Sequence, residues 1–252
     1  TPPADFSGSF DLDVVATSTD GTDTATTTDS LTVDVTPVAD APVLTATNVS
    51  GAEDSAIALD VTATSPDTVS VTFAGVPEGA VLSAGTDNGD GTWTVDAADI
   101  DGLTITPPAD YSGTLNLFAT ATASDGTDSA TTSDAFSVTV TPVADAPTFA
   151  TADASGLEDT AIALDIDAAL TDGSEVLSVT IGNIPSGSVL NAGTINPDGT
   201  VTLTPAELTG LTLTPPTDFS GSFDLDVVAT TTDGTDTATT TDSLTVDVTG
   251  DA

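Results

Sequence analysis

Apolar and polar residues alternate along most of the chain, in short runs separated by turn sequences. The runs at 69–75, 93–97, 103–107, 114–123 and 135–141 are rich in Val, Ile, Thr and aromatic residues. Alternation with a period of two places one face of a β-strand in a core and the other in water. Sequences such as NGDG, PEG and PSG between the runs are typical of turns. The pattern therefore predicts short β-strands throughout, with one helical turn around Pro205–Leu208.

The strand pattern belongs to a longer internal repeat. TPPADFSGSFDLDVVAT at 1–17 returns with changes at 106–122 and 214–230, so the offsets are 105 residues (106 − 1) and 108 residues (214 − 106). The three additional residues fall within 165–179, which aligns with 60–71. Self-similarity at such a period is the signature of tandem copies of one structural unit.

The sequence PVADAP occurs at 37–42 and 142–147 and separates the copies. We therefore expect the C-terminal part of an incomplete first repeat at 1–36, complete second and third repeats at 37–141 and 142–249, and a tail at 250–252. The first repeat matches 214–249 at 34 of 36 positions. Short strands with frequent turns over about 100 residues are typical of an immunoglobulin-like β-sandwich. The fold class predicted is all-β, with tandem sandwich domains joined by short linkers.

Charge adds a strong constraint. The 252 residues include 40 Asp and Glu but no Lys, Arg or His, which gives a formal net charge of −40. Nothing in the chain neutralises phosphates, so nucleic-acid binding is not expected. No apolar run approaches the roughly 20 residues that span a membrane, and membrane insertion is not expected either. Because 38% of the residues are hydrophobic, the composition is not that of a disordered acidic segment.

Acidic side chains that crowd together need a counter-charge, which proteins supply with basic residues or bound cations. Basic side chains are absent here, so bound cations remain. Ligand sets made only of oxygen favour a hard cation, and we expect Ca²⁺.

Catalysis is not expected. The chain has no His, Cys or Lys to act as a base, nucleophile or Schiff-base former. Two carboxylates alone suffice for glycoside hydrolysis, but that reaction requires a substrate cleft, which sandwich repeats with short loops seldom provide. We therefore predict that the protein is not an enzyme.

Strand order determines where the loops of a sandwich lie. With strands lettered A to G, the A–B and E–F loops lie where the chain leaves a repeat, and the B–C and F–G loops lie where it enters. GAED (51–54) and PPADYSG (107–113) are then the A–B and E–F loops of the second repeat, while TDGSE (171–175) and DGTD (233–236) are the B–C and F–G loops of the third. The acids predicted to converge at the junction are Glu53, Asp54, Asp110, Asp145, Asp172, Asp233 and Asp236.

Together with their equivalents in the other repeats, the acids of these loops and linkers form the candidate calcium ligands. Calcium takes about six to eight oxygens, and backbone carbonyls and water complete such sets. The candidates are Asp5, Asp40, Glu53, Asp54, Asp67, Asp110, Asp125, Asp128, Asp145, Glu158, Asp159, Asp172, Asp218, Asp233 and Asp236.

Simpler interpretations stay open for several of these motifs. DGTD also suits a hairpin turn, because Asp-Gly favours type I′ turns, and the acids of the A–B loops also suit a solvated loop. For DNGDG (87–91) a hairpin is favoured over a calcium loop, because the third repeat has INPDG there. Trp93 and Tyr111 are expected to pack rather than to bind a ligand. Asp11, Asp13 and Asp34 alternate with apolar residues and mark a solvated sheet face.

The PVADAP linker, the Gly-x-Glu-Asp loop and TPPxD(F/Y)SG together resemble the cadherin-like and immunoglobulin-like repeats of giant bacterial surface adhesins, of the biofilm-associated and repeats-in-toxin types. The similarity covers essentially the whole chain. It implies secretion, an extracellular or cell-surface location, calcium-rigidified arrays and a role in attachment or biofilm cohesion. Two departures are that the glycine-rich nonapeptides of the toxin family are absent, and that the linker lacks the Asn-Asp-Asn core of true cadherins.

Three non-catalytic functions follow from these observations. The first is a calcium-rigidified extender whose partners are the neighbouring repeats of the same chain. The second is a filament or sheath subunit whose partners are neighbouring copies. Residues 1–36 alone would expose strand edges and an apolar face, which either upstream residues or a neighbouring chain must complete. The third is glycan binding, which one Trp and one Tyr in the chain disfavour.

Overall fold

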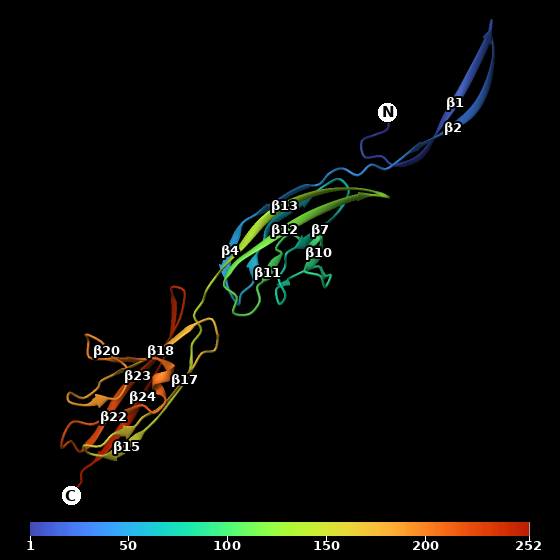
Figure 1. Ribbon diagram of the computed structural model, residues 1–252. Helices are drawn as coiled ribbons and strands as arrows, with labels where there is room; N and C mark the ends of the chain where they lie inside the picture. The colour runs from blue at the N-terminus through green and yellow to red at the C-terminus, as the bar shows by residue number, and fades with distance from the viewer. Residues whose placement is uncertain (252) are drawn as a thin grey trace. The chain divides into compact units, whose positions relative to one another are not determined.

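The computed structural model describes residues 1–251 and is almost entirely β-structure. It divides into two compact units, one formed by Thr1–Ala109 with Gly113–Val140, and the other by Asp110–Ser112 with the chain from Thr141 onward. The prediction of an all-β chain with repeated sandwich domains is confirmed (Figure 1).

The first repeat is a long two-stranded hairpin. Strand β1 (Gly8–Asp20) pairs antiparallel with β2 (Asp23–Val35) over their whole length, from Gly8 opposite Val35 to Asp20 opposite Asp23. Gly21 forms the turn with a positive φ of 62°, which glycine adopts without steric cost. Apolar side chains on this hairpin, including those of Leu12 and Leu31, are exposed.

Two sheets form the second repeat. The larger has the strand order β4-β13-β12-β7-β10-β9, and the smaller groups are β5-β11-β8 and β3-β6. Strands β5 and β6 are two parts of one strand B that is interrupted at Leu59, where the Leu59 amide donates to the Leu103 carbonyl. The two smaller groups therefore make up one sheet with the strand order A-B-E-D. The elements are β3 (Val43–Thr47), β4 (Val49–Ala52), β5 (Ile57–Ala58), β6 (Asp60–Thr64), β7 (Thr68–Ala74), β8 (Val81–Leu82), β9 (Thr86–Asp87), β10 (Thr92–Asp96), the 3₁₀ turn η1 (Ala97–Asp99), β11 (Thr104–Thr106), β12 (Gly113–Asp125) and β13 (Asp128–Thr141).

The third repeat copies this topology, with sheets β15-β24-β23-β18-β21-β20, β16-β22-β19 and β14-β17. Strand β15 runs parallel to β24, while the other strand pairs of this repeat are antiparallel. The elements are β14 (Thr148–Ala152), β15 (Ala154–Leu157), β16 (Ile162–Ala163), β17 (Asp165–Ala169), β18 (Val176–Gly182), β19 (Val189–Leu190), β20 (Thr194–Ile195), β21 (Val201–Leu203), the helical turn α1 (Pro205–Leu208), β22 (Thr212–Thr214), β23 (Gly221–Asp233) and β24 (Asp236–Thr249).

Strand A changes sheets halfway along each complete repeat. In the third repeat it leaves β17 and joins β24, and the break falls at Asp153, whose Oδ1 accepts the Thr245 amide at 2.8 Å. Asn48 does the same for the Ser137 amide of the second repeat at 2.8 Å. A short side chain with an acceptor oxygen satisfies an amide that the break would otherwise leave without a partner.

The core lies between the two sheets and follows the alternation of the sequence. Along β23 the side chains of Leu225, Val227 and Ala229 are buried, and along β24 those of Leu244 and Val246. These residues pack against strand B and strand E from the opposite sheet. Burial of such side chains is the main stabilising contribution to a sandwich.

Several local predictions are confirmed. Each predicted apolar run of the second repeat coincides with one of the strands β7, β10, β11, β12 and β13, and the single helical turn is α1. DNGDG forms the hairpin between β9 and β10, in which the Gly89 amide bonds Asp87 Oδ1 at 2.8 Å. Asp11, Asp13 and Asp34 are exposed, as expected for a solvated face. Tyr111 lies in the loop two residues before β12.

Candidate metal centre

The linker before the second repeat is held by two aspartates of that repeat. The Ala39 amide donates to Asp128 Oδ2 at 3.0 Å, and the Asp40 amide donates to Asp67 Oδ2 at 2.7 Å. Asp67 lies in the B–C loop before β7, and Asp128 begins β13 at the F–G turn. We call this end of a repeat, where its linker arrives, the entry end. The predicted placement of B–C and F–G loops beside the incoming linker matches these bonds.

The entry end of the third repeat uses the same arrangement. The Ala144 amide donates to Asp236 Oδ2 at 3.0 Å, and the Asp145 amide donates to Glu175 Oε1 at 2.5 Å. The Asp145 carbonyl in turn accepts the hydroxyl hydrogen of Thr231. Both linkers are thus fixed through their backbones to carboxylates of the repeat that follows.

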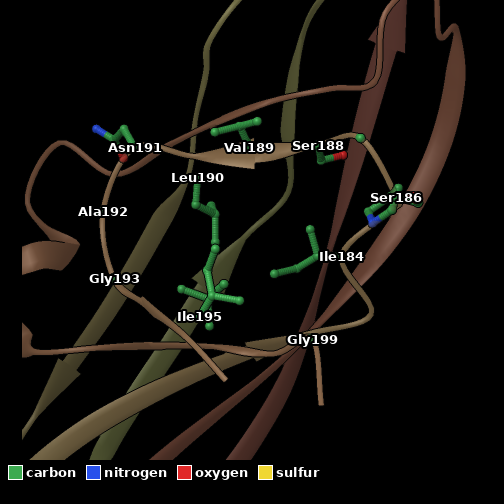
Figure 2. Close-up of a pocket in the computed structure, with 13 residues that line it drawn as sticks. Ile184, Ser186, Ser188, Val189, Leu190, Asn191, Ala192, Gly193, Ile195 and Gly199 are labelled. Atoms are coloured by element: carbon green, nitrogen blue, oxygen red, sulfur yellow. The ribbon is translucent and has the colours of Figure 1, made fainter. Parts of the chain in front are cut away.

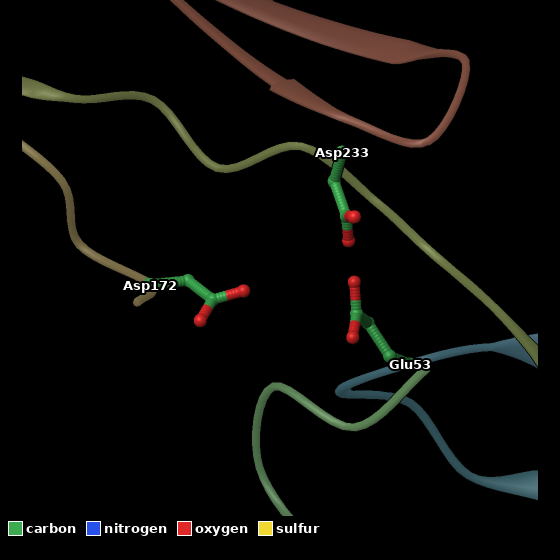
Figure 3. A group of neighbouring side chains, drawn as sticks. All are labelled: Glu53, Asp172 and Asp233. Atoms are coloured by element: carbon green, nitrogen blue, oxygen red, sulfur yellow. The ribbon is translucent and has the colours of Figure 1, made fainter. Parts of the chain in front are cut away.

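Three carboxylates at the entry end of the third repeat are buried. Asp172, Glu175 and Asp233 keep 4%, 5% and 8% of their surface exposed. Oxygens of Asp172 and Asp233 lie within 4.8 Å of each other, and their side chains turn toward the same space in Figure 3. Asp172 also bonds the amide and hydroxyl of Ser174, at 2.9 and 2.5 Å, which fixes the B–C loop locally.

Two oxygens of this group have no hydrogen-bond partner, Glu175 Oε2 and Asp233 Oδ2. A buried carboxylate oxygen without a partner is costly, and the chain has no basic side chain to pair with it. A hard divalent cation satisfies carboxylate oxygens directly. The donor chemistry therefore fits Ca²⁺. Asp172 and Asp233, whose oxygens lie within 4.8 Å of each other, would hold it, and Glu175 Oε2 is a further buried acceptor at the same end of the repeat.

At the opposite end of the third repeat, the acids of the A–B loop accept hydrogen bonds from backbone amides. Asp159 Oδ1 accepts the Asp218 amide at 3.2 Å, and Glu158 Oε1 accepts the Asp251 amide at 3.0 Å. These A–B and E–F loop acids therefore lie together, beside the chain that leaves the repeat. In the second repeat the equivalent Glu53 lies in the turn between β4 and β5 and is buried, whereas Glu158 is partly buried.

Left-handed backbone conformations recur in these loops. The residues with positive φ at equivalent places are Asp54 and Asp159 in the A–B loops, and Asp5, Asp110 and Asp218 in the E–F loops. Aspartate tolerates this region better than most residues other than glycine. The repeated motifs thus dictate the same loop geometry in each copy.

The carboxylate of Asp110 lies close to that of the linker residue Asp145. Its loop, 110–112, belongs to the second unit, and its carboxylate lies within 4.8 Å of that of Asp145. Asp125, Asp40 and Asp5 are not within either of the acidic groups that the described residues form. The wider convergence of Glu53 and Asp54 with the acids of the third repeat stays a prediction.

Sequence reasoning missed Glu175 and Thr231. The signal for Glu175 was the three-residue insertion, because an offset of 108 places Glu175 on Asp67. Thr231 corresponds to Ala123 of the second repeat and to Ser18 of the first. The Thr231 hydroxyl donates to the Asp145 carbonyl, whereas Ala123 has no hydroxyl at the equivalent position.

Lowered carboxyl pKa values occur away from this centre. Hydrogen bonds from the Thr92 hydroxyl and amide lower the pKa of Asp90, and those from Thr200 lower the pKa of Asp198. The Thr204 amide and hydroxyl lower the pKa of Glu207. Asp90 and Asp198 are exposed and Glu207 is partly buried, and the hydrogen bonds of all three lie within local turns.

A separate hollow of about 450 Å³ lies in the third repeat (Figure 2). It is lined by Ile184, Leu190, Ile195 and neighbouring small residues, and no acidic side chain contributes to it. No helix among the described residues is long and apolar enough to cross a membrane.

Comparison with known proteins gives structural likeness only. No family model matches the chain, and no curated protein matches it. Among solved structures it is similar to an endo-fucoidan hydrolase of glycoside hydrolase family 107, with 16% identity over 100% of this chain and a TM-score of 0.31. The chain spans 35% of the length of that structure.

Two further solved structures illustrate the same likeness. Cadherin-like domains 1 to 4 of zebrafish RET match 96% of this chain, which covers 58% of theirs, at 13% identity and a TM-score of 0.29. The D00-D0 domain of intimin matches 80% of this chain over 99% of its own, at 16% identity and a TM-score of 0.30. Such scores support no inference about function, and the fold assignment rests on the strand order and registers above.

Proposed function

We propose that the chain is a stretch of calcium-rigidified extender repeats from an extracellular adhesive protein that serves surface attachment or biofilm cohesion, and that it has no catalytic role. The observation that carries the proposal is the entry end of the third repeat. There the linker backbone is bonded to Glu175, and buried carboxylate oxygens of Glu175 and Asp233 have no hydrogen-bond partner.

Calcium would act on the linker through the side chains that already hold it. When bound, it supplies the positive charge that the sequence lacks. Glu175 has one oxygen on the Asp145 amide and a second that is free to coordinate. A carboxylate fixed by a cation loses its freedom to turn away, so the linker amide keeps its bond. Each linker would then behave as a stiff joint.

The repeated sequence supports a spacer role. Residues 1–36 and 214–249 differ only at positions 4 and 18 of the first copy. A spacer requires length and uniform joints rather than varied binding surfaces. The resemblance of the linker and loop motifs to repeats of bacterial surface adhesins points in the same direction.

Small-angle scattering of the whole chain tests this function. With calcium we expect a larger radius of gyration and a narrower distribution of interatomic distances than with a chelator at equal ionic strength. Asp172→Asn combined with Glu175→Gln is the matched variant, and it should respond less to calcium. Unchanged dimensions of the native chain on calcium addition would contradict the extender role.

A second candidate function is a filament subunit. The apolar side chains of Leu12, Val14 and Leu31 on the first-repeat hairpin are exposed, and either the remaining strands of that repeat or a neighbouring copy would cover them. Electron microscopy and sedimentation of the purified chain test it, because a filament subunit polymerises with rising concentration whereas an extender stays monomeric.

A further inference from the structure

The two linkers are held by the same hydrogen bonds, but the entry end of the third repeat carries one more acid than that of the second. In both repeats a B–C acid bonds the amide of the linker Asp, and an F–G acid bonds the amide of the preceding Ala. The three-residue insertion then adds Asp172 to the third repeat only. The B–C loop of the second repeat, Thr64–Asp67, has one acid, Asp67, which corresponds to Glu175. It has none that corresponds to Asp172.

Three acids at the entry end of the third repeat, Asp172, Glu175 and Asp233, are more than nine-tenths buried. Two of their oxygens, Glu175 Oε2 and Asp233 Oδ2, have no hydrogen-bond partner. A cation bound there would satisfy both oxygens.

Rigidity differs as well. Asp172 is fixed by the amide and hydroxyl of Ser174, and Asp145 is held at both its amide and its carbonyl, the latter by Thr231. At the second repeat the carbonyl of Asp40 accepts only a longer bond of 3.4 Å from the Ser65 hydroxyl. The affinity of a calcium site rises with the number of charged ligands and with the rigidity of the site.

From these differences we infer that the entry end of the third repeat binds calcium more tightly than the entry end of the second, so that the two linkers stiffen at different calcium concentrations. The inference rests on the proposed function and adds a graded response to it. The linker at 142–147 is rigid at low calcium, and the linker at 37–42 becomes rigid only when calcium rises further.

Calcium titration of the isotope-labelled whole chain, followed by NMR, tests this order. The amides of Asp145 and Asp40 report the two linkers separately, because each donates to an acid of its own entry end. We expect the Asp145 signal to reach its midpoint at a calcium concentration about tenfold or more below that of Asp40. Equal midpoints, or the reverse order, would overturn the inference.

Two isosteric variants assign the difference to the insertion. Asp172→Asn keeps an oxygen for the Ser174 amide but removes a charge, so we expect the midpoint of Asp145 to move close to that of Asp40. Asp67→Asn should shift the Asp40 midpoint alone. An Asp145 midpoint that Asp172→Asn leaves in place would overturn the role of the insertion. If neither amide responds to calcium, the proposed function itself fails, whereas equal responses remove only the ranking.

Discussion

Individual hydroxyl groups lower the carboxyl pKa of an aspartate in each of two turns of this chain. Thr92 and Thr200 each bond an aspartate two residues earlier through both the amide and the hydroxyl, Asp90 and Asp198. Both aspartates have a lowered pKa for that reason. The bonds therefore contribute stability above the ordinary carboxyl pKa of 3.8, and this contribution is lost as the pH falls through the lowered value.

Thr200→Val tests this cause at a single residue. It removes the hydroxyl bond and keeps the amide bond, so the pKa of Asp198 should move part of the way back toward its ordinary value. Carboxyl titration by NMR measures the pKa, and Asp90 in the same sample is the internal control. A pKa of Asp198 that does not rise would show that the hydroxyl is not the main cause.

At the scale of residues, the acids that the sequence could place are mostly those that recur in the repeated motifs. The linker acids and Asp233 could be placed from the sequence because their motifs recur at a regular offset, and Asp172, which lies in the insertion, because strand order puts the B–C loop beside the linker. Glu175 and Thr231 escaped because each differs from its counterpart, Asp67 and Ala123 respectively. Which carboxylate oxygens are buried depends on side-chain packing, and alternation alone does not contain that information.

At the scale of elements, two nearly identical hairpins have very different environments. Leu225 in β23 is 0% exposed within the core of the third repeat, while Leu12 at the same place in β1 is 46% exposed. The registers of the two hairpins are the same. Their strands were predictable from alternation, but the exposure of the first hairpin depends on what packs against it.

This pair gives a matched test of burial. Leu225→Ala should lower the free energy of unfolding of the third repeat by about 2–5 kcal/mol, because it leaves a cavity in the core. Leu12→Ala should cost less than about 1 kcal/mol, since much of its side chain is already in water. Urea unfolding measures both. An equally large loss for Leu12→Ala would mean that another copy covers the hairpin, as the filament function requires.

Strand β15 leaves no room for a side chain at Gly156. A Cβ built there would lie 2.6 Å from Ile162 Cγ1, whereas a Cβ at Gly182 in β18 has nothing nearer than 3.7 Å. Gly156→Ala should therefore destabilise the third repeat by about 1–3 kcal/mol, the usual cost of overpacking. Gly182→Ala, with a smaller effect in thermal unfolding, is the control, and equal effects would contradict the steric explanation.

For the whole molecule, electrostatic repulsion is the dominant constraint. A net charge of −40 without any basic side chain opposes compaction. Monovalent salt screens part of this repulsion between exposed acids, but it acts weakly on buried carboxylates. A cation that binds only the folded chain also adds its binding free energy to stability. Calcium and sodium are therefore expected to differ in effect at the same ionic strength.

Thermal unfolding of the whole chain in calcium and in chelator, at matched ionic strength, tests the central claim most directly. We predict a melting temperature several degrees or more higher in calcium, with the gain reduced by Asp172→Asn. Equal melting temperatures in calcium and chelator would contradict the account, because the buried carboxylates would then be stable without a bound cation.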